Sequence, residues 1–140
     1  MNVSHVLGID PGLSGAIALI QADTGELFDV ADMPTYKTVT ATGKKAYGVL
    51  VGLAEASGCH WSTIRPQEWK EWHPGLIGAG GDLKGHKRTA AIKTASRQAA
   101  MARFPYHADA FWRLRDDGRA EAALIADAYL RSIVARPVAA

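Results

Sequence analysis

The sequence predicts a single α/β domain spanning residues 1–140, and three observations support this class. With 140 residues, 48 % of them hydrophobic and 21 % charged, the chain can bury one core but is too short for two. Three short apolar runs joined by glycine-bearing turns come first and indicate an antiparallel β-meander. Segments with apolar residues at helical spacing follow, so the expected order is β-β-β-α-β-α-α.

The predicted meander occupies the first quarter of the chain. Its strands are Val6–Ile9, Ala16–Ile20 and Leu27–Met33. The first two are almost continuously hydrophobic, which is typical of strands covered on both faces. Pro34 closes the third strand, and the polar, threonine-rich stretch Thr35–Lys45 is predicted to be a loop.

Helices dominate the rest of the predicted fold, with one further strand among them. The spacing predicts a helix at Tyr47–Ala56, a strand at His60–Arg65, a helix start at Pro66–Lys70 and a glycine-rich loop at Pro74–Gly81. Two longer helices follow at Thr89–Phe104 and Asp117–Val134. Their apolar faces are predicted to be Ile92, Ala95, Ala99 and Ala102 in the first and Ala120, Leu124, Ala128 and Ile133 in the second.

Charge and cysteine content limit the function classes. No acidic residue occurs from Leu83 to Ala108, although six cations do, which suits a protein that binds a polyanion. A solvated basic helix is the alternative. The single cysteine, Cys59, excludes an internal disulfide and a zinc cage and fits a reducing cytoplasm. No apolar run reaches the roughly 18 residues of a membrane span, so we expect a cytoplasmic protein without a membrane partner.

Asp10 is the first candidate functional residue. It follows the first predicted strand directly, within the sequence Gly8-Ile9-Asp10-Pro11-Gly12, where sheet geometry would hold a carboxylate rigidly. Gly12 and Gly15 would keep the approach to it free of side chains. The alternative is that Asp-Pro-Gly is turn chemistry, with the aspartate capping its own backbone.

Asp117 and Glu121 form a second candidate group at the start of the last helix. Their i, i+4 spacing places both carboxylates on one helix face. Helix capping explains an aspartate at this position but explains Glu121 poorly. Carboxylates that converge from a strand end and a helix start are suited to bind Mg²⁺, and such ions support phosphodiester cleavage.

These two acidic motifs, VLGIDPGLSGA at Val6–Ala16 and DGRAEAALIA at Asp117–Ala126, resemble a known family. They are similar to the opening strand pair and to the glutamate-ending catalytic helix of the RuvC-type Holliday-junction resolvases, especially the phage members. Tyr47–Gly58 resembles the family's dimer helix, and Thr63–Lys70 resembles its strand followed by PQEWK. Lys84–Pro105 resembles the basic helix before the last one.

The resemblance implies an RNase H-like fold, a homodimer formed through the Tyr47–Ala56 helix, and nicking of four-way DNA junctions that depends on Mg²⁺, with Mn²⁺ as an alternative. Asp10, Asp117 and Glu121 would be the catalytic metal ligands, with Asp116 as a substitute for Asp117. Phosphate contacts would come from Lys84, Lys87, Arg88 and Lys93, which predicts salt-dependent DNA binding.

The chain also departs from the family between Pro34 and Tyr47. In the family, a helix and a central strand that ends in a catalytic glutamate lie at this point. Here only the twelve residues Thr35–Ala46 are present, and none is acidic. We therefore expect an RNase H-like domain that lacks one helix, one central strand and one carboxylate.

Two alternative functions remain at this stage. The missing carboxylate favours a module of the same fold that binds branched DNA without cutting it. A nucleotide-binding protein of the actin and sugar-kinase type shares the Asp-x-Gly strand pair, but it needs a second domain and a second phosphate loop. A chain of 140 residues lacks the length for both.

Overall fold

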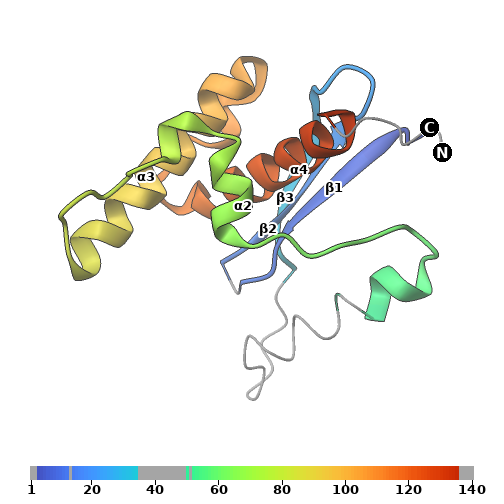
Figure 1. Ribbon diagram of the computed structural model, residues 1–140, viewed down its shortest axis with the longest axis horizontal. Coiled ribbons are helices and arrows are strands. Elements are labelled where there is room, and N and C mark those ends of the chain that lie inside the picture. Colours follow the sequence, from blue (N-terminus) through green and yellow to red (C-terminus); the bar gives the residue numbers. More distant parts are fainter. Residues whose placement is uncertain (1–2, 13, 35–49, 51, 136–140) are drawn as a thin grey trace.

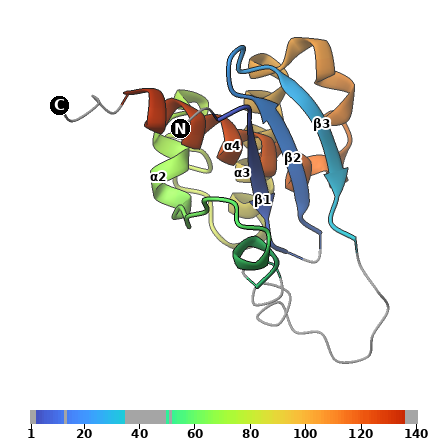
Figure 2. The ribbon, with the colours of Figure 1, turned by 90° about the vertical axis from the view of Figure 1, so that its right-hand side faces the viewer.

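The computed structural model describes residues 3–12, 14–34, 50 and 52–135 and contains a three-stranded antiparallel sheet. Its strands are β1 (His5–Asp10), β2 (Ala16–Gln21) and β3 (Leu27–Asp32), in the order β1-β2-β3 (Figure 2). Asp10 pairs with Ala16, and Ala16 pairs with Asp32, with a register shift between Leu19 and Ile20. The predicted meander is confirmed.

Helix α4 (Asp117–Ala135) covers one face of this sheet. Alanines on α4 and a glycine on β1 allow a very close approach: a Cβ added at Gly8 would lie 2.1 Å from the Ala122 carbonyl oxygen. Val6, Ala18 and Ile20 fill the layer between β1, β2 and α4. The helix therefore lies directly on the strand that carries Asp10.

Helices α2 (Pro66–Glu71) and α3 (Gly85–Arg103) pack on α4 (Figure 1). The 3-10 turns η1 (Pro74–Leu76) and η2 (Pro105–Ala110) contact α3, and η3 (Leu114–Asp116) leads into α4. Proline begins α2, as predicted, because its fixed φ suits the first helical turn. Among the described residues, no helix is long and apolar enough to cross a membrane.

Charged residues tie the C-terminal half of α4 to its neighbours. Asp127 is fully buried, with Arg103 Nε 2.8 Å from its Oδ1 and Arg131 Nη2 2.8 Å from its Oδ2. Arg103 also donates to the Gly25 carbonyl oxygen at 2.8 Å. The ion pair between Arg103 and Asp127, together with the hydrogen bond to Gly25, therefore joins α3, α4 and the turn between β2 and β3.

Two strand predictions are wrong. The first two strands are not covered on both faces, because Leu7 is 54 % exposed on the side away from α4 and Phe28 of β3 is 61 % exposed beside it. His60–Arg65 is not a strand: residues 59–65 form no ladder, and only Ile64 packs against the core. The apolar residues in that segment are too few to hold it against a sheet edge.

Helix positions are predicted well, and the apolar face of the last helix is confirmed, because Ala120, Leu124 and Ala128 are buried and Ile133 packs against the core. The last helix matches within one residue, and α3 starts four residues before its predicted start at Thr89. The fully buried residues of α3 are Ser96, Arg97 and Ala100, while Ala95 and Ala99 of the predicted face are only partly buried against the core. In the predicted Tyr47–Ala56 helix, residues 50 and 52–56 are helical and the others lie outside the described residues, as does Thr35–Ala46. The described sheet has no fourth strand.

Candidate functional site: a carboxylate group at the start of α4

The turn after β1 brings Asp10 to the first turn of α4. A Cβ added at Gly118 would lie 2.2 Å from the Ser14 carbonyl oxygen, and one at Gly15 would lie 2.0 Å from that of Asp10. Both glycines are therefore needed for the turn to fold tightly against the helix. Because of this contact, the end of β1 and the start of α4 present their carboxylates to the same region, as the sequence predicts.

Asp117 and Glu121 occupy the first two turns of α4, and the turn before them is fixed by a different aspartate. Asp116 accepts a hydrogen bond from the Arg113 backbone N–H at 2.9 Å, and its Oδ1 lies 2.9 Å from the Arg113 guanidinium. Its side chain is buried in this cap of η3. Asp116 is thus a structural cap, which argues against it as a substitute for Asp117.

The three predicted carboxylates affect one another electrostatically. Burial raises the pKa of Asp10, and the negative charge of Asp117 raises it further, against a hydrogen bond from the Gly12 N–H. The pKa of Glu121 is also raised, first by burial and then by the charge of Asp10. Asp117 adds to the effect on Glu121. Burial and neighbouring negative charge therefore disfavour the ionised forms of Asp10 and Glu121, a cost that a cation bound beside them would offset.

Helix α3 contributes one cation and one hydroxyl to this group. Lys93 Nζ lies 2.7 Å from Asp117 Oδ2, and the Ser96 hydroxyl donates to Glu121 Oε1 at 3.2 Å. The ammonium also lies within electrostatic reach of Asp10 and Glu121, which both raise the pKa of Lys93 after the Asp117 hydrogen bond. Lys93 therefore faces the carboxylates, although the sequence assigns it to phosphate contacts.

The group has the donor chemistry of a magnesium site but not a complete ligand set. Among the residues that the structure describes, no three His, Cys, Asp or Glu side chains are close enough together to hold a metal ion. Neither Asp10 nor Glu121 forms an ion pair with a described residue, whereas Asp117 forms one with Lys93. Mg²⁺ typically takes one or two protein carboxylates and fills its other positions with water and substrate phosphate. Asp10 and Glu121 fit that requirement.

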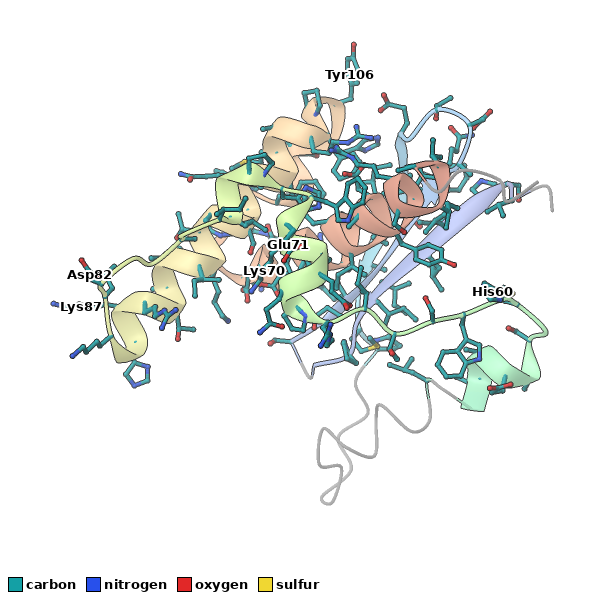
Figure 3. The ribbon with its side chains drawn as sticks, viewed as in Figure 1. His60, Lys70, Glu71, Asp82, Lys87 and Tyr106 are labelled. Carbon is teal, nitrogen blue, oxygen red and sulfur yellow. The ribbon has the colours of Figure 1, made fainter. Side chains whose placement is uncertain are left out.

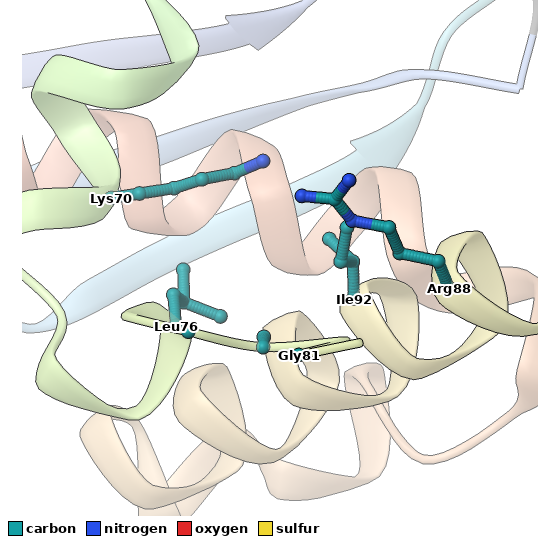
Figure 4. Close-up of a pocket in the computed structure, with 7 residues that line it drawn as sticks. Lys70, Leu76, Gly81, Arg88 and Ile92 are labelled. Carbon is teal, nitrogen blue, oxygen red and sulfur yellow. The ribbon is translucent and has the colours of Figure 1, made fainter. Parts of the chain in front are cut away.

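A positively charged pocket adjoins the carboxylates. It has a volume of about 250 Å³ and lies between α2, η1 and α3. Lys70 reaches into it from α2 and Arg88 from α3, and their charged ends face each other (Figure 4). Lys70 also lowers the pKa of Glu121, so the positive charge of this pocket acts on the carboxylate group. The lining contains no acidic residue, which suits a phosphate.

The predicted DNA-contacting residues fall into two sets. Lys84 and Lys87 are exposed at the start of α3, and Figure 3 shows Lys87 at the free end of this helix, away from Lys70. Arg88 lines the pocket, while Lys93 pairs with Asp117. The structure thus brings Asp10, Asp117, Glu121 and Lys93 together and leaves Lys84 and Lys87 outside that group.

Two residues of this region were missed by the sequence reasoning. Lys70 is the cation of the PQEWK segment, which the sequence predicts to be a helix start and which carries part of the family resemblance, without a predicted binding role for the lysine. Ser96 could have been found from its spacing, because it lies three residues after Lys93 and therefore on the same face of α3.

The comparisons with known proteins add no relative. A scan against protein-family models and a search of curated proteins both find no match for this chain.

Proposed function

We propose that this protein is a Mg²⁺-dependent endonuclease that nicks branched DNA, with four-way junctions as its substrate class. The observation that carries this proposal is that the tight turn after β1 brings Asp10 to the start of α4, where its charge raises the pKa of Glu121 after the larger effect of burial, near a cationic pocket. The substrate class rests on the sequence resemblance to the RuvC-type resolvases, and the same resemblance supports an RNase H-like fold for the domain.

In this proposal Asp10 and Glu121 would hold the metal ion. When bound, Mg²⁺ would supply a positive charge on the scissile phosphate and lower the pKa of a water molecule. The Gly12 N–H and the Ser96 hydroxyl orient the two carboxylates. Both donors belong to closely packed elements, so the carboxylates would not need to reorganise when DNA arrives.

The pocket between Lys70 and Arg88 would hold a backbone phosphate next to the cleavage point. A planar guanidinium and a flexible ammonium can contact two oxygens of one phosphate from opposite sides. Lys84 and Lys87 would contact the backbone farther along α3. Each such contact releases counterions, so we expect junction affinity to fall steeply with salt and the slope to shrink by about one unit for each lysine removed.

The homodimer that the family resemblance implies is also part of this proposal. Leu53, in the helical residues 52–56, is 61 % exposed, so that helix offers an apolar side chain to a second copy. Two active sites in one dimer would allow paired nicks on opposite strands.

A second candidate function is binding of branched DNA without cleavage. The ion pair between Lys93 and Asp117 favours it, because it removes one predicted ligand from the metal site. The twelve-residue segment Thr35–Ala46 offers no acid in place of the family's additional carboxylate.

A gel assay with a labelled four-way junction distinguishes the two candidates. Wild type, Asp10→Asn and the control Asp109→Asn, at an exposed position of η2, are incubated in Mg²⁺, Mn²⁺ or EDTA, with linear duplex alongside. We expect paired, metal-dependent nicks from wild type and Asp109→Asn, and binding without nicks from Asp10→Asn. Equal cutting by Asp10→Asn would refute the metal site. Binding without nicks by wild type would support the second candidate.

A further inference from the structure

Lys93 has an unusual position for a residue of a basic helix. Its Nζ lies 2.7 Å from Asp117 Oδ2, and its side chain is 46 % exposed while that of Asp117 is only 12 % exposed. The other cations near the start of α3, Lys84, Lys87 and Arg88, form no ion pair with any described residue. One lysine of this helix is thus turned toward the carboxylates while its neighbours face solvent or the pocket.

The arrangement of the two helices explains why Lys93 reaches this place. Lys93 and Ser96 are three residues apart on α3, and Asp117 and Glu121 are four residues apart on α4. Because the two helices pack against each other, the ammonium meets the first carboxylate and the hydroxyl meets the second. The pairing is therefore a property of the helix packing and not of one flexible side chain.

We propose that Lys93 is a built-in counter-cation that competes with the divalent metal ion for Asp117. This inference rests on the proposed metal site at Asp10 and Glu121. While the ammonium occupies Asp117 Oδ2, that oxygen is not available to a metal, and the lysine charge repels a divalent ion nearby. Lys93 thus limits how tightly the free protein binds its metal and how many carboxylates take part.

The competition has a measurable consequence. Replacement of Lys93 by an uncharged side chain removes the repulsion and frees the Asp117 carboxylate for the metal. Metal affinity should then rise, although a lysine normally counts as a favourable part of a DNA-cleaving site. The gain should depend on Asp117, because the freed carboxylate produces it.

The test is a titration with Mn²⁺ in the absence of DNA, followed by electron paramagnetic resonance of the free ion. We expect Lys93→Met to bind Mn²⁺ at least threefold more tightly than wild type. The double variant with Asp117→Asn should lose that gain. Lys87→Met, an exposed lysine at the start of the same helix, should bind Mn²⁺ as wild type does. If circular dichroism shows that Lys93→Met does not fold, Lys93→Gln is titrated in its place.

The outcomes separate this inference from the proposed function. Unchanged or weaker Mn²⁺ binding by Lys93→Met and Lys93→Gln would overturn the competition and leave the metal site intact. A gain that survives Asp117→Asn would also overturn it, because Asp117 would then play no part. If none of the variants binds Mn²⁺, the metal site of the proposed function is wrong, and the competition is wrong with it.

Discussion

Acidic side chains lie at two places along helix α4, and their charges are balanced differently: Asp127 lies in its second half, and Asp117 and Glu121 lie at its start near Asp10 of β1. In its second half, Asp127 has two arginines within 2.8 Å and lies wholly inside the protein. At its start, Asp117 has one lysine at 2.7 Å, and Glu121 has a hydroxyl, while Asp10 has no described cation within ion-pair distance. Asp127 is thus flanked by two positive charges, although its Oδ2 accepts no hydrogen bond from a described residue, whereas the three carboxylates at the start of α4 have one lysine among them.

Under the proposed function, Asp127 serves the fold and the carboxylates at the start of α4 serve a ligand. A buried carboxylate that is fully paired holds neighbouring elements in register, whereas incomplete pairing raises the free energy of the folded protein. Such a cost is typical of sites whose partner arrives later.

The largest effect should come from Asp127→Asn. This change leaves Arg103 and Arg131 without their shared carboxylate and weakens the connection between α3, α4 and the Gly25 turn. Because both arginines are partly exposed and can be hydrated, we expect a loss of about 2–3 kcal/mol in the free energy of unfolding, below the full cost of an unpaired buried charge. Urea unfolding measures it, with Asp109→Asn as the control. A loss below about 0.5 kcal/mol would mean that the two acidic groups do not differ.

Gly8→Ala should have the next largest effect, and it should reach the site as well as the fold. The added Cβ would lie 2.1 Å from the Ala122 carbonyl oxygen, so β1 must move away from α4. We expect a loss of about 2 kcal/mol in stability and a fall in nicking, because Asp10 moves with the strand.

The control for Gly8→Ala is Gly52→Ala. Gly52 lies in the helical residues 52–56, and a Cβ there meets no atom within 4 Å. Unchanged stability of Gly8→Ala would show that β1 and α4 are not packed as closely as described.

A smaller effect concerns His73, which borders the paired group. Burial lowers the pKa of His73, and the charges of Arg131 and Arg103 lower it further, against the Leu124 carbonyl and Asp127. The unfolded chain therefore binds a proton more readily than the folded protein near the ordinary value of 6.5. Stability should be complete above that pH and fall as the pH drops below it.

Urea unfolding at pH 5.5 and 7.5 tests this dependence on wild type and His73→Gln. Glutamine can still donate to the Leu124 carbonyl, which the His73 Nε2 contacts at 2.9 Å, but it does not titrate. We expect the variant to lose less stability at the lower pH than wild type, with the exposed His60→Gln as control. Equal losses would show that His73 does not contribute to the acid sensitivity.

The sequence predicts the elements of this protein better than their environment. Apolar runs and turns are local signals, so the meander and α4 are predicted within one or two residues. Coverage of Leu7 depends on which elements lie across the sheet, and no local pattern reports that. The strand predicted at His60–Arg65 fails because only Ile64 of that segment packs against the core, which is too little apolar contact to hold it at a sheet edge.

The same limit applies to the site. The spacing of Asp117 and Glu121 and the turn after Asp10 predict three carboxylates in one region, because a strand end and a helix start fix their positions. The partner of Lys93 depends on how α3 rotates against α4, and the predicted face of α3 is displaced from the observed one. A cation expected to face DNA therefore faces Asp117.

The smallest expected effect, a gain in stability from Glu121→Gln, has a sign opposite to that of Asp127→Asn. Burial and the charge of Asp10 raise the pKa of Glu121, so its ionised form opposes folding at pH 7. Glutamine can keep the hydrogen bond from the Ser96 hydroxyl without the charge. We expect the free energy of unfolding to rise by about 0.5 kcal/mol, with exposed Glu71→Gln as control, while nicking is lost. A loss of stability from both Glu121→Gln and Asp127→Asn would mean that both acidic groups serve the fold, and the metal site would lose its main electrostatic support.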